Sequence, residues 1–464
     1  MSAIGEVLAV VIEKVKPKPE DRDRVMRVLD GIKGKIEREA MARGLKVRVE
    51  VEGSLAKDTW VATDRDIDIF IIFPRGTPKD DLKDVGLQLA KSGAGEGWRL
   101  GFAEHPYVEA NVGGYKVDIV PSVEIGEGER PVTAVDRTPL HTKFVLSKLD
   151  ERMRDDVRLL KQFMKGVGVY GAELKVGGFS GYLCELLVIH YGSFRGVLEA
   201  AAKWRGRTVI DYMKYYKEGE AEQVFDSHLI IIDPVDRRRN AAAAGSPQCY
   251  ATFIAAAGRF LEKPSIEYFF PTKEELDVPK VLERIKERGV SLVAVKVSCP
   301  RLPSDVLWGE IQRSLMKTVG LFERYDFKIL DQKAWSDEEK NLVFILELES
   351  RRLRTGKIHQ GPKVWYHEDA KRFLEKHLRG ENVLAGPSIR GERWWVEFRR
   401  KYTDAKELLE REFAILQMSK DVMEEVKKGF EVYVDEEIAE LCAKEPRLVE
   451  EIYAFLRKRP LWLK

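Results

Sequence analysis

Residues 53–74 read GSLAKDTWVATDRDIDIFIIFP, and the run DIDIFIIF near their end decides the fold of the region. It is apolar enough for a buried strand, yet it opens with two carboxylates, Asp66 and Asp68. Side chains two residues apart in a strand project from the same face, with Cα atoms roughly 6.6–7 Å apart. The two carboxylates can therefore converge on one metal ion, while Ile67 and Ile69 face the other way, into a core.

A second pair of acids competes with this one, because Asp64 and Asp66 have the same spacing. Arg65 separates them, whereas Ile67 separates Asp66 from Asp68. If Asp64 belonged to the site, Arg65 would lie on the core face before the apolar strand begins, which is unfavourable for a charged side chain. The alternation therefore favours Asp66 and Asp68.

A third acid, Asp118, lies in KVDIVP, where Val117 and Ile119 flank it as isoleucines flank Asp68. An acid inside an apolar strand is costly to bury unless its charge is compensated. Taken alone, a DxD at a strand start is usually a solvated strand end, and a lone acid such as Asp118 is as often a salt-bridged structural residue. The combination of Gly53-Ser54, the DxD and the later acid is far more specific.

Three carboxylates on adjacent strands suit a site for two Mg²⁺ ions. Mg²⁺ prefers oxygen ligands and binds through few carboxylates together with substrate phosphates. Pairs of such ions serve in phosphoryl transfer, where they assist both the attacking and the leaving oxygen. We therefore predict that Asp66, Asp68 and Asp118 are the metal ligands and the catalytic residues.

The 464-residue chain has a nearly neutral charge balance, since 79 Lys and Arg against 77 Asp and Glu give a net charge of +2. This balance neither requires nor excludes a nucleic-acid partner, because a basic groove can be offset by acidic surface elsewhere. The four cysteines are scattered without a CxxC pair, which favours a reducing cytoplasm over a disulfide framework or zinc site. The first residues, MSAIGEVLAVVIEK, show neither the basic start nor the small-residue cleavage site of a signal peptide, and no uncharged apolar run approaches the roughly 18 residues of a membrane span. We expect a cytoplasmic protein without a membrane partner.

The order of elements predicts a multidomain α+β protein whose first part, 1–147, is a mixed sheet with helices. Apolar residues at helical spacing predict an amphipathic helix over 20–43, and a further helical segment follows near 78–92. A hairpin is expected over roughly 106–120, with Gly113-Gly114 as its turn.

The second predicted part, 148–260, is mostly helical. Prolines clustered in 262–280 mark a boundary to the third part, 261–464. There the strands SLVAVKVSC, NLVFILELES and RWWVEFRRK alternate with helices, which predicts a second α/β unit of ferredoxin-like character, with a tail.

Basic and aromatic residues occur together in the last third of the chain, as RRLR at 351–354, KVWY at 363–366 and RWW at 393–395. Arg and Lys would hold RNA phosphates and the aromatic rings would stack on bases. Core packing is the competing explanation for the tryptophans.

The carboxylate arrangement resembles the catalytic palm of the DNA polymerase β nucleotidyltransferase superfamily. Beyond the palm, several motifs resemble the archaeal class I CCA-adding enzymes, also called tRNA nucleotidyltransferases. These motifs are AEHPYV (103–108), AVDRTPLHTK (134–143), VRLLKQFMKGVGVYGAELKVGGFSGYLCELL (157–187) and DPVDRRRN (233–240). The resemblance implies template-independent addition of CCA to the 3′ end of tRNA from CTP and ATP. It also suggests a homodimer.

The resemblance further implies a set of nucleotide-binding residues, namely Gly53, Ser54, Lys57, Thr138, His141, Lys161, Tyr170 and Arg239. Ser54 and Lys57 would contact the triphosphate, although the family often has Arg where Lys57 stands, and Lys loses the bidentate fork. Arg239 would choose C or A by reading the base edge, and its neighbours Arg237 and Arg238 leave that assignment open. GFSGYLCELL is expected to allow close packing of helices, because it does not match a phosphate-binding P-loop.

Two rival functions share some of these features. A poly(A) polymerase or oligoadenylate synthetase would use the same palm. A non-catalytic RNA-binding protein would have lost one of the three acids, and none is missing in this sequence.

Overall fold

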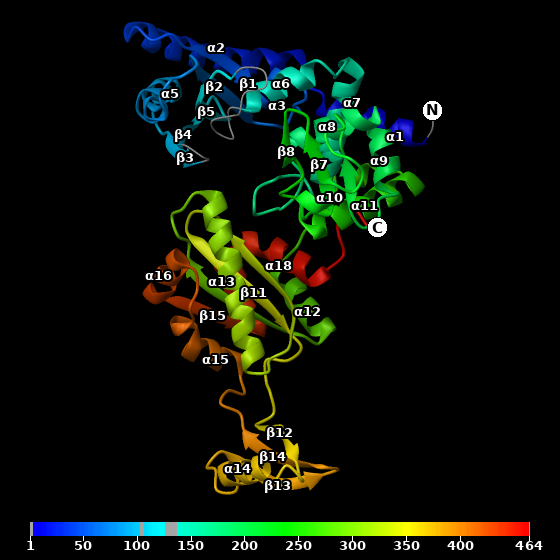
Figure 1. Ribbon diagram of the computed structural model, residues 1–464, viewed down its shortest axis with the longest axis vertical. Helices are drawn as coiled ribbons and strands as arrows, with labels where there is room; N and C mark the ends of the chain where they lie inside the picture. Colours follow the sequence, from blue (N-terminus) through cyan, green and yellow to red (C-terminus); the bar gives the residue numbers. More distant parts are fainter. Residues whose placement is uncertain (1–2, 103–105, 126–136, 464) are drawn as a thin grey trace. The chain divides into compact units, whose positions relative to one another are not determined.

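A computed structural model of the chain describes residues 3–102, 106–125 and 137–463 (Figure 1). It divides into two compact units, Met1–Lys273 with Leu461–Lys464, and Glu274–Pro460. The predicted divisions after residues 147 and 260 stay predictions. Residues 103–105 of the AEHPYV motif and 134–136 of the AVDRTPLHTK motif lie outside the described residues.

A five-stranded mixed sheet forms the N-terminal part of the first unit. Its order is β1-β2-β5-β4-β3; β2 and β5 are parallel, and all other neighbours are antiparallel. The strands are β1 (Arg48–Glu52), β2 (Asp66–Phe73), β3 (Arg99–Phe102), β4 (Pro106–Val112) and β5 (Tyr115–Val123). This is the mixed α/β organisation that the alternating pattern predicts.

Two helices, α2 (Pro19–Ala42) and α5 (Leu87–Ala94), cover one face of this sheet (Figure 1). The amphipathic face of α2 buries Leu29 and Ile36 in one core with Ile67 and Ile69 of β2. The opposite face of β2 carries Asp66 and Asp68, followed by Phe70 and Ile72, which are buried in a second, small apolar cluster.

The predicted hairpin is confirmed, because β4 and β5 are joined at Gly113-Gly114, with φ of +61° and +82°. Positive φ at both central residues is the property of a type I′ turn, which glycine adopts at little cost. The helix predicted over 78–92 is α4 (Lys79–Asp81), a π-helical turn (Leu82–Gly86) and α5. The short strand β3 was not predicted, because it has only four residues and follows the glycine-rich GAGEG.

Helices dominate the rest of the first unit, as predicted. They are α1 (Ala3–Val15), α6 (Thr138–Leu146), α7 (Glu151–Val167), α8 (Gly181–Tyr191), α9 (Phe194–Ala201), α10 (Ala221–Val224) and α11 (Pro247–Glu262). Phe163 of α7 is central to their core, with ring centroids 5.7 Å from Phe194 and 5.5 Å from Phe260. The C-terminal Trp462 joins the same core beside Tyr268.

A small sheet lies among these helices, with β6 (Thr208–Ile210), β7 (Leu229–Asp233) and β8 (Asp236–Asn240) in sequence order. The glycines of GFSGYLCELL permit close packing, as predicted. A Cβ at Gly178 would lie 2.3 Å from the Val169 carbonyl oxygen, and one at Gly181 would lie 3.2 Å from Cε of Lys161.

The second unit is built on a four-stranded antiparallel sheet of order β10-β11-β9-β15. Its strands are β9 (Ser291–Ser298), β10 (Ile329–Ser336), β11 (Asn341–Leu348) and β15 (Phe430–Val434). The helices are α12 (Val278–Arg288), α13 (Ser304–Arg324), α15 (Ala405–Glu412), α16 (Lys420–Lys428), α17 (Ile438–Lys444) and α18 (Arg447–Arg457). The sheet and the helices between its strands follow the order β9, α13, β10, β11, α15 and α16, β15 along the chain. This β-α-β-β-α-β order confirms the predicted ferredoxin-like character.

The strand RWWVEFRRK lies in the second unit, as predicted, but it is not part of that four-stranded sheet. It is β14 (Arg393–Arg399), the centre of a separate three-stranded sheet with β12 (Gly356–Lys363) and β13 (Val383–Arg390), joined by α14 (His367–His377). Alternation identified the strand but could not identify its partners, because β12 and β13 contain few buried side chains.

Two aromatic residues near β12 are exposed, with Trp365 at 47% and Tyr366 at 55%. Core packing does not account for these two rings. Among the described residues, no helix has the length and apolar character needed to cross a membrane.

Candidate active site

The structure brings the three predicted acids to one face of the first sheet. Asp68 of β2 and Asp118 of β5 are direct neighbours in the parallel register, and Asp66 lies two residues before Asp68 on β2, as the register partner of Lys116. The residues between them, such as Ile67 and Val117, are buried in the core on the opposite face. Parallel pairing of β2 with β5 therefore joins acids that are 50 residues apart in the sequence.

Two further carboxylates extend this arrangement into a row across four strands. Glu52 of β1 is the register partner of Asp68, and Glu109 of β4 is the partner of Asp118. Glu109 accepts hydrogen bonds from Arg99 at 2.6 Å and from the Tyr107 hydroxyl at 2.9 Å. The sequence reasoning missed both glutamates, because strand pairing had to be known before they could be placed beside the aspartates.

Within the described residues, Asp118 has one ion pair, with Nζ of Lys116 at 3.7 Å from its Oδ2, and no ion pair is formed by Asp66 or Asp68. Burial raises the pKa of Asp118 to about 6, even though Lys116 opposes the shift. Burial and the neighbouring Asp66 also raise the pKa of Asp68. Oδ1 of Asp118 is buried and accepts no hydrogen bond from the described residues.

These features fit a divalent cation, which would supply the missing positive charge and a partner for the unsatisfied oxygen. In the part of the chain that the structure describes, no three His, Cys, Asp or Glu side chains already enclose a metal position.

The backbone at Gly53 approaches Asp68 so closely that no side chain could stand there. Gly53 has φ of +66°, and a Cβ would lie 2.0 Å from Oδ2 of Asp68. It begins α3 (Gly53–Ala56), the short helix that also contains Ser54. Glycine thus allows the loop after β1 to lie directly against the acid.

The competing acid Asp64 has a different role. It precedes β2, accepts a hydrogen bond from the backbone N–H of Val61 at 3.1 Å, and is ion-paired with Lys165. Arg65 beside it is exposed, over the ring of Tyr115. The carboxylate of Asp64 therefore already has two partners within the protein, a backbone N–H and a lysine.

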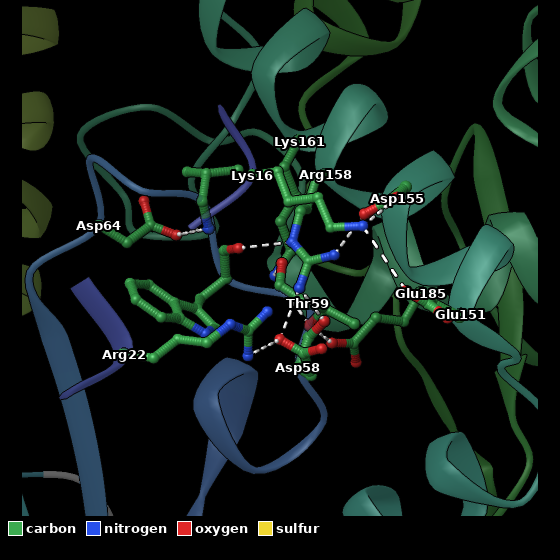
Figure 2. A network of polar contacts seen from close by, with 12 residues as sticks. Lys16, Arg22, Asp58, Thr59, Asp64, Glu151, Asp155, Arg158, Lys161 and Glu185 are labelled. Atoms are coloured by element: carbon green, nitrogen blue, oxygen red, sulfur yellow. Dashed lines mark hydrogen bonds and ion pairs between the residues drawn. The ribbon is translucent and has the colours of Figure 1, made fainter. Parts of the chain in front are cut away.

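The loop after β1 is fastened to α7 and α8 by buried polar contacts (Figure 2). Nζ of Lys57 donates to Glu185 at 2.6 Å, and the Thr59 hydroxyl donates to the same carboxylate at 2.5 Å. Nζ of Lys161 donates to the Thr59 carbonyl at 2.9 Å, and burial lowers the pKa of Lys161. The loop thus contains one predicted nucleotide-binding lysine, Lys57, and is bonded directly to the other, Lys161.

Arg158 of α7, which the sequence reasoning did not select, holds the same loop from another side (Figure 2). Its guanidinium donates to Asp58 and to Asp155, both at 2.6 Å, and to the Trp60 carbonyl at 3.0 Å. Asp58 has φ of +51°, a conformation that costs energy for a residue with a Cβ. The sequence feature that could have identified Arg158 is its place among the apolar residues of VRLLKQFM, where a charged side chain needs buried partners.

Two further predicted residues, His141 and Arg239, contact Asp233, the last residue of β7. Nε2 of His141 lies 2.9 Å from its Oδ2, and Nη1 of Arg239 donates to the same oxygen at 2.7 Å. The His141 ring stacks on Tyr182, with centroids 4.1 Å apart. Asp233 is not among the residues predicted from the sequence, although it is the first residue of the motif DPVDRRRN.

Tyr182 connects this cluster to the loop after β1. Its ring centre is 5.6 Å from Nζ of Lys57 on one side, and His141 stacks on the ring as well. Thr138 begins α6, one turn before His141. Tyr170 lies by the N-terminus of α8, with its hydroxyl 3.0 Å from where a Cβ at Gly181 would be, and burial raises its pKa.

The fold and the carboxylate face define a nucleotidyltransferase. Residues 33–141 match the nucleotidyltransferase domain, 155–270 match the second domain of tRNA nucleotidyltransferase, and 288–435 match the C-terminal domain of the CCA-adding enzyme.

Full-length relatives give the particular family. The chain is 39% identical to the CCA-adding enzyme of Saccharolobus islandicus (strain Y.N.15.51), over 98% of this chain and 99% of the relative. It is 37% identical to the CCA-adding enzyme of Methanothermobacter thermautotrophicus, over 96% and 97%. The chain belongs to the CCA-adding enzyme family. A solved structure of the Cid1 poly(U) polymerase is also similar, with a TM-score of 0.46 and 15% identity over 57% of this chain and 96% of the other.

Proposed function

We propose that this chain adds C, C and A in turn to the 3′ end of tRNA, using CTP and ATP and releasing pyrophosphate. The observation that best supports the chemistry is the in-register pair Asp68 and Asp118, with its unsatisfied carboxylate oxygen. The family membership supports the choice of tRNA as acceptor.

Asp66, Asp68 and Asp118 would hold two Mg²⁺ ions. When bound, the ions supply positive charge that lowers the pKa of the RNA 3′-hydroxyl and stabilises the leaving pyrophosphate. The backbone of Gly53, which touches Asp68, would keep the loop after β1 next to that reacting centre.

The residues of that loop would bind the triphosphate, which brings about four negative charges. Ser54 offers a hydroxyl, and Lys57 and Lys161 offer two ammonium groups. Glu185 and Thr59 fix those ammonium groups without exposing them to water. Ammonium groups that are already held in place lose little side-chain freedom when a phosphate binds to them.

His141, Tyr170, Thr138 and Arg239 would hold the sugar and base. Among the three arginines of DPVDRRRN, Arg239 is half-buried and held by Asp233, whereas Arg237 and Arg238 are exposed. This difference favours Arg239 as the residue that meets the base.

A product assay separates this function from its rivals. Purified protein is incubated with tRNA lacking its CCA end, Mg²⁺, CTP and ATP, and the products are sized and sequenced. We expect growth by three residues, CCA, and then a stop. A long adenylate tail would indicate a poly(A) polymerase, oligoadenylate made without tRNA would indicate a synthetase, and no addition would indicate a non-catalytic RNA-binding protein.

A further inference from the structure

Asp233 is a fully buried carboxylate that makes four contacts, one for each lone-pair position of its two oxygens. Oδ1 accepts from the Tyr182 hydroxyl and from the backbone N–H of Val235, both at 3.1 Å. Oδ2 contacts Nε2 of His141 at 2.9 Å and accepts from Nη1 of Arg239 at 2.7 Å. Since a carboxylate has about four acceptor positions, Asp233 has none left for a ligand.

The partners of Asp233 come from three separate parts of the fold. His141 lies on α6, Tyr182 on α8, and Arg239 on β8, opposite the strand that ends at Asp233. Burial alone would raise the pKa of Asp233, but His141 and Arg239 lower it to about 2, so the carboxylate is charged at neutral pH. One buried negative charge therefore fixes the positions of two residues that the proposed function assigns to the nucleotide.

Arg239 keeps most of its hydrogen-bonding capacity for a ligand. A guanidinium has five N–H donors and no acceptor. Within the described residues, one donor nitrogen of Arg239 is engaged, by Asp233, and 35% of its side chain is exposed.

A fixed set of donors can distinguish C and A from U and G. The ring nitrogen on the pairing edge is an acceptor in C (N3) and in A (N1), whereas it carries a proton in U (N3) and in G (N1). A guanidinium held opposite that nitrogen would bond to C or A, but it would face another donor in U or G, which leaves buried groups unpaired.

We infer that Asp233 is a positioning residue for nucleotide selection, which orients Arg239 so that the site accepts C and A and rejects U and G. This inference rests on the proposed function. Asp233 itself would not contact the substrate. It would act by holding Arg239 in place, and also His141, because both side chains bond to its carboxylate.

The test compares kcat/KM for CTP and for UTP in the first addition to tRNA lacking CCA. For Asp233→Asn we expect the CTP-to-UTP ratio to fall about ten- to a hundredfold, with a raised KM for CTP and an unchanged KM for tRNA. Arg239→Gln should lower the CTP-to-UTP ratio by a similar factor. The double variant should be no less selective than Arg239→Gln alone, because Asp233 acts through that arginine.

Asp236→Asn is the matched control, since Asp236 lies on the same hairpin and pairs with Arg137 at 2.9 Å instead. It should keep the wild-type ratio, and an equal loss in this variant would overturn the inference. If Asp233→Asn does not fold, Tyr182→Phe removes one of the four donors and keeps the ring stacked on His141. A severalfold fall in its ratio supports the inference, and an unchanged ratio overturns it.

The inference and the proposed function can fail separately. A wild-type protein that adds neither C nor A to tRNA would refute the proposed function. A selective wild type whose Asp233→Asn variant is equally selective would refute the inference alone.

Discussion

Asp68→Asn and Asp118→Asn are each expected to abolish nucleotide addition, lowering turnover by at least about a thousandfold. Asparagine keeps the size of the side chain and removes the negative charge that would hold Mg²⁺. The change should also relieve repulsion within the row of acids, since burial and Asp66 already raise the pKa of Asp68. Both variants should therefore fold at least as stably as the wild type and bind tRNA with nearly unchanged affinity.

Single-turnover addition of CMP and a gel-shift titration with tRNA measure the two quantities separately. Asp64→Asn is the control, because Asp64 has the same DxD spacing but is ion-paired with Lys165. It should keep most of the activity. Wild-type turnover by either Asp68→Asn or Asp118→Asn in Mg²⁺ would remove the basis for the metal assignment.

Gly53→Ala is expected to lower kcat/KM for CTP by about a hundredfold or more. The new Cβ would lie 2.0 Å from Oδ2 of Asp68, so either the carboxylate or the loop must move by more than an ångström. A displacement of about 1 Å in a reacting group can cost roughly a hundredfold in rate.

Gly44→Ala separates this clash from backbone strain. Gly44 has φ of +68°, close to the +66° of Gly53, but no atom lies within 4 Å of the position of its Cβ. Both variants should lose about 1 kcal/mol in free energy of unfolding for the left-handed conformation, and Gly53→Ala should lose more because of its clash with Asp68. Equal activity losses in the two variants would show that strain, and not contact with Asp68, is responsible.

The sequence was sufficient for features that depend on local pattern. Alternation in DIDIFIIF put Asp66 and Asp68 on one face, and Gly113-Gly114 identified a turn whose positive φ values only glycine adopts readily. The ferredoxin-like character of the second unit followed in the same way from apolar strands and amphipathic helices.

Features that depend on pairing between distant segments were not predictable in this way. Glu52 and Glu109 join the acid row because β1, β2, β5 and β4 are neighbours in the sheet. Lys57 is 128 residues from its partner Glu185, and His141 is 92 residues from its partner Asp233, so nothing near these buried acids in the sequence reveals those two contacts. For the same reason, the pattern predicted RWWVEFRRK as a strand of the second unit but could not show that it pairs with β12 and β13 in a separate sheet.

Anomalous diffraction from crystals grown with Mn²⁺ and a non-hydrolysable CTP analogue tests the proposed reacting centre most directly. Mn²⁺ replaces Mg²⁺ at oxygen sites and gives an anomalous signal that identifies its ligands. We expect Mn²⁺ peaks bound by Asp66, Asp68 and Asp118, with the triphosphate beside Gly53. Peaks bound by Asp64 instead, or no peak at these three acids under saturating Mn²⁺, would contradict this expectation.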